Sequence, residues 1–333
     1  RADSMRAVIA DRPQYLHLAR SLGFREDAGE TAVIMRALDY VASRATEVVY
    51  AELLALRYFP MISEVPLGAR TFTFAVLDVT GVAERTTGSG KGLPRAGIVL
   101  SEVTSSIGSY GAKYGWTTEE LRAFSYANGN GRGPAINLDT RRGEAAQLMI
   151  ARKLDSVCAF GDPDDTRIKG VLTDTNIATN NVLYDWLAAP TTFDQMLDDM
   201  ITIANRVVIQ SKRVWQPDTL LLPVAHMLAT QRKLNSLGTR SVLQAFNDAM
   251  AAAKRDVTVD SWPLLETANA ARTGPRAIAY VRDPEKIGCI CPAVFIAQPP
   301  EQRELEWTIS AEGICGGGAV RVPTSAVYYE LTP

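Results

Sequence analysis

Residues 70–103 decide the fold, because they contain two extended stretches separated by a glycine-rich segment. The first stretch, Arg70–Val79, reads RTFTFAVLDV, and the second, Ala96–Val103, reads AGIVLSEV. Both are rich in the Thr, Phe, Val and Ile residues that suit a pleated surface. The segment between them contains Thr86–Gly92, TTGSGKG, which is polar and flexible. We therefore expect a long β-hairpin with a mobile tip.

The strands of this hairpin have no obvious partner nearby in the sequence. Alternation places Phe72 and Phe74 on one face of the first strand and Thr71 and Thr73 on the other. A lone two-stranded ribbon is only marginally stable in water. The hairpin therefore needs another surface on which to lie.

Helical periodicity dominates the neighbouring sequence. Before the hairpin, we expect an arm over residues 1–30 and a helix over 31–57 that stops at Pro60. After it, apolar spacing and capping signals predict helices over 117–128, 139–161, 191–212 and 239–254, and one starting at Pro223. The predicted inward face of the 139–161 helix consists of Ala146, Met149, Ile150, Leu154, Val157 and Cys158. In the 191–212 helix, we attribute Asp194, Asp198 and Asp199 to the helix dipole.

The remaining chain has the character of strands. A short buried strand is expected over 219–222, before Pro223. The later predicted strands are Asp256–Val259, Arg276–Val281, Ile287–Ile296, Glu304–Ile309 and Val320–Leu331. The order of arm, hairpin, helices, mixed elements and terminal strands indicates an α+β fold rather than repeated βαβ units.

Composition excludes several classes of protein. The 333 residues are 47% hydrophobic and 22% charged, which argues against a wholly disordered chain. With 35 basic and 37 acidic residues, the net charge of −2 disfavours strong attraction of the whole chain to nucleic acid or anionic lipid. The longest apolar runs are too short for a membrane span. The apolar run that follows Arg6 is too short for the hydrophobic region of a secretory signal. We expect no membrane partner.

Residues suited to catalysis or metal binding are scarce. The chain has two histidines and four cysteines. Cys289 and Cys291 form a C-x-C pair rather than the C-x-x-C pair of zinc sites, so we expect Cys158, Cys289, Cys291 and Cys315 to be buried or inert thiols. No Ser-His-Asp or Cys-His arrangement can be assembled. We therefore predict no catalytic, cofactor or metal site.

Four local motifs favour structural interpretations. Gly88–Gly92 lacks the spacing and the following helix of a phosphate-binding loop, so we expect a flexible tip. Gly313–Gly318 indicates a tight turn, and Asp162–Asp165 a solvated turn rather than a metal loop. His226 has neither an acidic partner nor a second histidine at i+4, which favours a packed or capping residue.

Short phrases within this order carry a resemblance to a known family. They are Leu154–Asp162 leading to Gly170–Leu172, then Pro217–Pro223, and Gly317–Pro323 before Tyr328. Together with the hairpin and the two helices after it, they resemble tailed-bacteriophage major capsid proteins from about Val48 to the end. These proteins have the Hong Kong 97-type (Johnson) fold, which encapsulins and herpesvirus capsid floors share.

The resemblance implies a division of the chain. An N-terminal arm and helix would occupy residues 1–69, and the hairpin, called the E-loop in the family, residues 70–103. The peripheral P-domain with its long spine helix would occupy 104–166 and the axial A-domain 167–302. The strands of residues 303–333 would return to the P-domain.

The resemblance also implies a function. The chain would self-assemble into hexamers and pentamers of an icosahedral virion shell around double-stranded DNA, within the host cytoplasm. Its partners would be copies of itself, DNA by weak non-specific contact, and possible portal and decoration proteins, with no cofactor. The candidate intersubunit contacts are Thr87, Gly88, Gly90, Lys91, Gly92 and Leu93.

We expect the shell to be non-covalent. Some relatives crosslink an E-loop lysine to a neighbouring asparagine, but no partner for Lys91 can be identified.

Two alternative functions remain at this point. An encapsulin with the same fold would hold a cargo protein instead of a genome, although its chain is usually shorter. A cytosolic α+β enzyme would form a small oligomer and turn over a metabolite.

Overall fold

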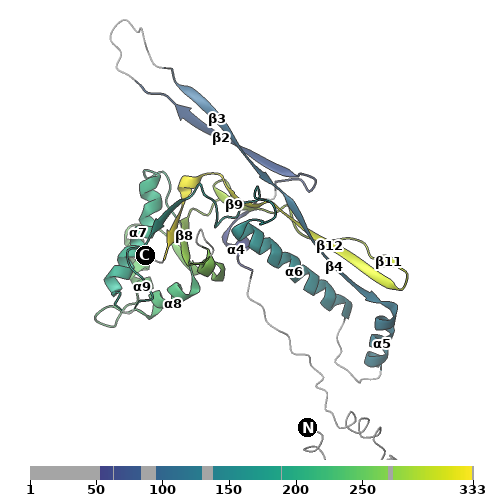
Figure 1. Cartoon of the computed structure of the whole chain (residues 1–333). Helices are drawn as coiled ribbons and strands as arrows, with labels where there is room; N and C mark the ends of the chain where they lie inside the picture. The colour runs from purple at the N-terminus through teal and green to yellow at the C-terminus, as the bar shows by residue number, and fades with distance from the viewer. Residues whose placement is uncertain are drawn as a thin grey trace, which may run out of the picture. The chain divides into compact units, whose positions relative to one another are not determined.

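The structure, a computed structural model, describes residues 53–62, 64–83, 95–129, 138–188, 190–268 and 273–331 (Figure 1). The predicted arm, most of the predicted 31–57 helix and the hairpin tip lie outside these residues. The chain divides into two compact units, residues 1–49 with 119–137 and residues 50–118 with 138–333. The described part of the first unit lies in helix α5, Thr118–Gly129, which the sequence predicted.

The second unit mixes short and long strands with helices, as the α+β interpretation predicted. Its elements in chain order are α4 (Ala55–Tyr58), β1 (Met61–Ile62), β2 (Thr71–Thr80), β3 (Gly97–Ser106), β4 (Gly108–Thr117), α6 (Leu138–Phe160), β5 (Ala178–Asn181), α7 (Phe193–Gln210), β6 (Thr219–Leu222), α8 (Val224–Arg232), α9 (Val242–Ala252), β7 (Thr258–Ser261), η1 (Pro263–Thr267), β8 (Arg276–Tyr280), β9 (Ile287–Ile290), β10 (Ala293–Ala297), β11 (Glu301–Arg303), β12 (Glu306–Cys315), β13 (Gly317–Val320), η2 (Pro323–Ser325) and β14 (Ala326–Glu330).

A five-stranded sheet with the order β5-β14-β8-β6-β7 forms one core of this unit. Every residue of β6 and β8 is buried, because helices α7 and α9 pack beside the sheet. Helix α7 starts with a capping box in which Thr192 and Gln195 bond reciprocally. Its buried residues include Met196, Met200, Ile203, Ala204 and Val207, which lie on the face that packs on the sheet.

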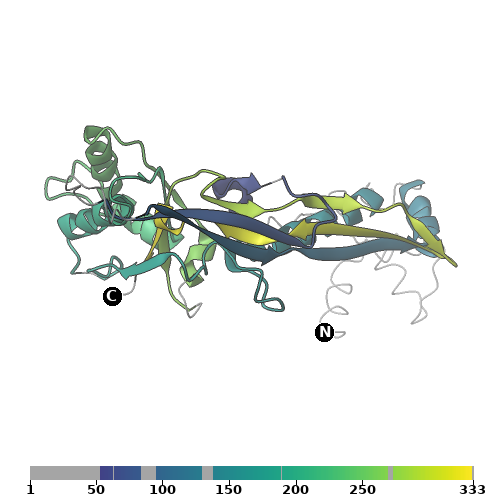
Figure 2. The same cartoon turned by 90° about the horizontal axis from the view of Figure 1, so that it is seen from above.

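The long helix α6 packs on a second sheet, in which β12 pairs antiparallel with β4 along its whole length. Figure 2 shows these two strands, β12 in yellow and β4 in blue-green, running side by side. The predicted face of α6 is buried at Ala146, Ile150, Leu154, Val157 and Cys158. Met149 is 65% exposed, contrary to the prediction, because it lies at the edge of this stripe rather than within it.

Helix α6 ends as the sequence predicted. Gly161 follows its last residue with φ +82°, a conformation that suits glycine. A Cβ atom at Gly161 would lie 2.4 Å from the carbonyl oxygen of Ile168. The chain therefore reverses closely against the end of the helix.

Prolines divide two segments that the sequence predicted as continuous strands. Pro292 separates β9 from β10 within Ile287–Ile296, and Pro323 begins the 3-10 turn between β13 and β14. Proline lacks the N–H group that a strand interior needs. Strands β4 and β5 were not predicted, because glycine interrupts the alternation of β4 and polar residues make up most of β5.

The prediction of a tight turn at Gly313–Gly318 is wrong. Gly313 lies within β12, while Gly317 and Gly318 begin β13. A Cβ atom at Gly318 would lie 2.4 Å from Cγ2 and 2.5 Å from the backbone nitrogen of Val171. The glycines therefore permit close strand packing rather than a reversal of the chain.

Asp199 has a role that the helix-dipole interpretation missed. It lies beyond the first turn of α7 and is only 3% exposed. Its carboxylate accepts hydrogen bonds from the indole N–H of Trp186 at 2.9 Å and from the backbone N–H groups of Leu183 and Tyr184 at 3.3 Å each. Asp199 thus fixes the preceding loop onto the helix.

Candidate assembly surface

Strands β2 and β3 form a separate two-stranded sheet, as the sequence predicted. They pair antiparallel in unbroken register from Thr71 opposite Ser106 to Thr80 opposite Gly97. Figure 1 shows this pair as a ribbon. No other strand among the described residues pairs with it, so its stability depends on its ends and on what covers its faces.

The base of the ribbon is anchored in the second unit. Phe72 packs against a small core that contains Ile62, Val65, Ile290 and Ala319. The guanidinium carbon of Arg321 lies 5.5 Å from the centre of the Phe72 ring. This end of the hairpin is therefore held by its own chain.

Hydrogen bonds reinforce the same anchor. The hydroxyl of Ser105 lies 3.3 Å from the carbonyl oxygen of Arg167 and 3.2 Å from that of Gly316, and it can donate to either. The N–H group of Ile107 donates to the carbonyl oxygen of Arg70 at 2.9 Å, which extends the β2–β3 pairing to the base of the ribbon. The base is thus fixed on both strands.

The far half of the ribbon carries exposed apolar side chains. Leu77 pairs with Leu100 and Val79 with Ile98, so the four side chains share one face. Their exposed fractions are 69% for Leu77, 76% for Val79, 72% for Ile98 and 58% for Leu100. We call these four residues the distal apolar patch. Contiguous exposed apolar surface of this kind marks an interaction site.

The opposite face of the ribbon carries both apolar and polar side chains. Phe74 and Val76 are half-buried and Val99 is exposed, but Thr80 and Ser101 on the same face of the far half are polar and exposed. The exposed apolar side chains of the far half are therefore concentrated on the face of the patch.

The sequence-predicted contact residues all fall in the hairpin tip, outside the described residues: Thr87, Gly88, Gly90, Lys91, Gly92 and Leu93. Their role stays a prediction. The distal apolar patch was missed. Both alternating sets of positions in the first strand include apolar residues, so the sequence does not indicate which face is exposed.

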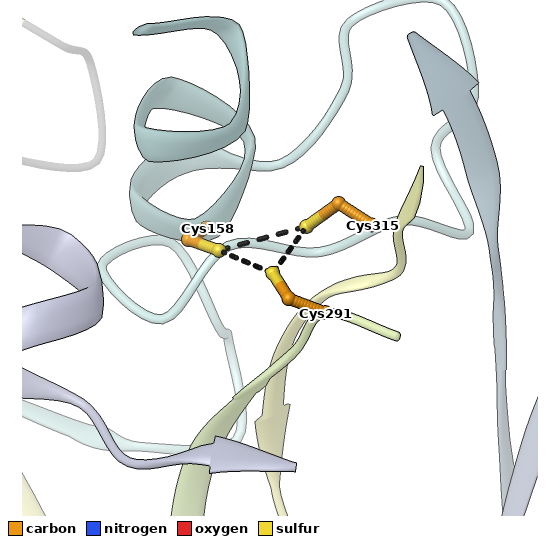
Figure 3. Close-up of side chains that lie close together, drawn as sticks. All are labelled: Cys158, Cys291 and Cys315. Atoms are coloured by element: carbon orange, nitrogen blue, oxygen red, sulfur yellow. Dashed lines mark hydrogen bonds between the residues drawn. The ribbon is translucent and has the colours of Figure 1, made fainter. Parts of the chain in front are cut away.

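One group of potential metal ligands meets in the core. The Sγ atoms of Cys158, Cys291 and Cys315 lie 3.2–3.6 Å from one another (Figure 3). All three side chains are at most 1% exposed, and Cys289 is also buried, so the prediction of buried thiols is confirmed. The sequence spacing gave no sign that these thiols come together.

His226 is packed, as predicted. It is 2% exposed, and its ring centroid lies 6.0 Å from that of Trp186. Burial lowers its pKa to about 4, which keeps the imidazole neutral near pH 7. Its Nδ1 atom is buried without a hydrogen-bond partner. The other histidine, His17, lies outside the described residues.

The Asp162–Asp165 segment forms a polar turn, as predicted. Asp162 accepts a hydrogen bond of 2.6 Å from the hydroxyl of Tyr110, which lowers the pKa of this carboxyl. Asp165 pairs with the guanidinium of Arg167 at 3.0 Å. These carboxylates are thus occupied by protein partners.

Comparisons with known proteins agree on one architecture. The model of the Major capsid protein family matches residues 81–331. The structure described as the capsid of Myoviridae phage XM1 has a TM-score of 0.76 and 17% identity, over 92% of this chain and 99% of that chain. A structure from Mycobacterium phage Adephagia has a TM-score of 0.59 and 12% identity, over 93% of this chain and 98% of that chain. No curated protein matches the chain.

Proposed function

Because the chain belongs to the Major capsid protein family and is a structural protein of the phage capsid, we propose that its copies form the hexamers and pentamers of an icosahedral shell around double-stranded DNA. The match covers residues 81–331, most of the described chain. The encapsulin alternative is less supported, because the matching family is one of capsid proteins. The role is structural, and we propose no enzymatic activity.

The observation that carries this assembly is the distal apolar patch. Burying a leucine or valine side chain contributes roughly 1.5–3 kcal/mol. The patch gains none of this while it faces water, whereas a neighbouring copy could cover it. Many such contacts, repeated around a closed shell, stabilise the assembly by mass action. In this proposal the hairpin is an E-loop that lies across the adjacent subunit.

The rest of the chain follows the same scheme. Residues 104–166, with α6 as the spine, would form the P-domain, and 167–302, with four strands of the five-stranded sheet, the A-domain around the capsomer axis. Residues 303–333 would return to the P-domain through β12, although their last strand, β14, completes the five-stranded sheet. The pairing of β12 with β4 and the packing of both on α6 support this return.

The net charge of −2 suits a wall that encloses DNA without binding it tightly. We assign DNA, portal and decoration proteins as secondary partners, and the host cytoplasm as the place of assembly. No helix in the described parts of the chain has the length and apolarity to cross a membrane.

Removal of the hairpin tip tests the proposal. The full chain and a variant lacking residues 87–93 would be expressed, purified and viewed by electron microscopy. We expect closed shells from the full chain, and from the variant a folded subunit with unchanged circular dichroism and few shells. Normal shells from the variant would overturn the role of the tip, and small oligomers from the full chain would overturn the assembly itself.

The contents and covalent state of the shells are a separate test. Co-purified nucleic acid rather than a single cargo protein would distinguish a genome container from an encapsulin. A denaturing gel of purified shells should show one band at the subunit mass, because we propose no crosslink through Lys91. A ladder of higher bands would contradict the non-covalent shell.

A further inference from the structure

All four cysteines of the chain are buried, and three of them converge from distant segments. Cys158 lies in α6, Cys291 directly follows β9, and Cys315 ends β12. The distances between their Sγ atoms are 3.6 Å for Cys158 and Cys291, 3.5 Å for Cys158 and Cys315, and 3.2 Å for Cys291 and Cys315 (Figure 3). The three sulfurs thus form a nearly equilateral triangle where the helix and two sheets meet.

This triangle has the size of a metal-thiolate site. Zinc–sulfur bonds of about 2.3 Å in tetrahedral geometry place neighbouring sulfurs about 3.8 Å apart. The observed separations fall short of that by about 0.2–0.6 Å, a gap that small side-chain movements close. An ion slightly out of the sulfur plane could reach all three atoms at once.

From this geometry we propose that Cys158, Cys291 and Cys315 bind one thiophilic metal ion, Zn²⁺, as three thiolates. The ion ties the spine helix α6 to the segments that follow β9 and end β12. Binding converts three thiols into three thiolates and releases three protons to the solvent. No electron is transferred, and no oxidant is needed.

The backbone places a hydrogen-bond donor on one of the three sulfurs, that of Cys315. The backbone N–H of Gly317 donates a hydrogen bond to the Cys315 sulfur at 3.3 Å. Outer-shell hydrogen bonds of this kind orient metal ligands. Gly317 has φ +77° and strand β13 begins there, so this donor is fixed by the backbone.

Zinc suits this core better than a monovalent thiophilic ion. Three thiolates with Zn²⁺ leave a net charge of −1, whereas Cu⁺ would leave −2, and buried charge is costly. The site is enclosed, since each ligand side chain is at most 1% exposed. The ion is therefore expected to enter while the chain folds and to exchange slowly afterwards.

The fourth cysteine provides a matched control. Cys289 is fully buried in the same core. Its Sγ atom does not belong to the group whose ligand atoms all lie within 4.8 Å of one another, although its thiol interacts with that of Cys158. Replacing Cys289 perturbs the core in a similar way without removing one of the three proposed ligands.

The test measures metal and thiols in the full chain. The protein would be expressed in zinc-supplemented medium, purified, and analysed for metal per subunit by plasma mass spectrometry. Thiols would be counted after denaturation with a chelator. We expect close to one zinc per subunit and four free thiols. Protein free of metal overturns the proposal, and so does a loss of two thiols, which would indicate a disulfide within the cysteine group.

Single substitutions then assign the ligands. Cys158→Ser, Cys291→Ser and Cys315→Ser should each lose most of the bound zinc, whereas Cys289→Ser should keep it. Cobalt supplied in place of zinc should give thiolate-to-metal charge-transfer absorption in the native protein and in Cys289→Ser. Equal metal loss in all four variants would overturn the three-thiolate assignment. The metal content of the native chain tests the proposal even if a variant fails to fold, and this measurement does not depend on shell assembly.

Discussion

Strands β3 and β6 are both rich in aliphatic residues, yet their environments are opposite. Leu220, Leu221 and Leu222 of β6 are fully buried between helices and neighbouring strands. Leu100 of β3 is 58% exposed in a ribbon that pairs with no third strand of the described chain. Similar side chains thus stabilise the subunit core in β6 and remain exposed in the hairpin, where we propose that another copy covers them.

The contrast teaches that composition alone does not define a core. The five-stranded sheet is complete within one chain, since its central strands have hydrogen-bonded neighbours on both sides and helices beside them. The hairpin is complete only at its base. In the proposed assembly its far half is covered by a neighbouring copy, so the two regions should respond differently to the same kind of substitution.

The largest expected effect comes from placing charge on the distal apolar patch. The double substitution Leu77→Asp with Leu100→Asp should weaken association at least about a hundredfold, because about 3 kcal/mol or more of apolar burial per hairpin is lost. Electron microscopy and size-exclusion chromatography would show soluble subunits instead of shells. Leu237→Asp, at a position 80% exposed outside the hairpin, is the control and should assemble normally. Shells from the double variant would contradict the docking role of the patch.

A matched pair of leucine truncations should separate stability from assembly. Leu220→Ala is expected to lower the free energy of unfolding by about 2–5 kcal/mol, because it leaves a cavity in a closed core. Leu100→Ala should change it by less than about 0.5 kcal/mol in the unassembled subunit. Chemical denaturation below the assembly concentration measures both. Equal losses would mean that the hairpin belongs to the subunit core.

Within the helical region, Asp199→Asn should cost about 1–3 kcal/mol of unfolding free energy. The substitution replaces a carboxylate that accepts three hydrogen bonds with a group that has one acceptor oxygen. The control is Asp198→Asn, since Asp198 is exposed on the same helix. Thermal unfolding of the two variants should differ clearly, and similar melting curves would restore the dipole explanation for both acids.

The smallest effect is a pH dependence centred on His226. Burial lowers its pKa from 6.5 to about 4, so the unfolded chain binds a proton more readily than the folded chain between these values. Stability therefore falls as the pH falls through this window, by about 1 kcal/mol between pH 6.5 and pH 5.5. His226→Gln should flatten this part of the profile. If the variant keeps the same dependence of stability on pH, groups other than His226 cause that dependence.

Much of the fold could be predicted from local sequence. The α+β class, the hairpin strands, α6, α7 and β6 are confirmed, because periodicity and glycine or proline signals mark them within short windows. The capsid family is confirmed as well, on phrases spread along the chain. Local signals failed where tertiary contacts decide the outcome. Gly313–Gly318 has the composition of a turn, yet close packing on Val171 makes it strand.

The candidate sites were harder to predict. The cysteine group joins residues 133 and 157 positions apart in the chain, and no spacing rule spans such intervals. The distal apolar patch was hidden for a different reason. Its residues were correctly assigned to strands, but whether they face water depends on the absence of a covering layer, and that is a property of the whole fold.

The unbroken pairing of β2 with β3 has a geometric consequence for a closed particle. Ten paired residues, at about 3.3 Å each, make a ladder of about 33 Å whose base is bonded to Gly316 through Ser105. A change of about 5° in the direction of the ladder at this base would move the far end by about 3 Å. Small differences in packing beside Cys315 would therefore be magnified where the proposed neighbouring subunit lies.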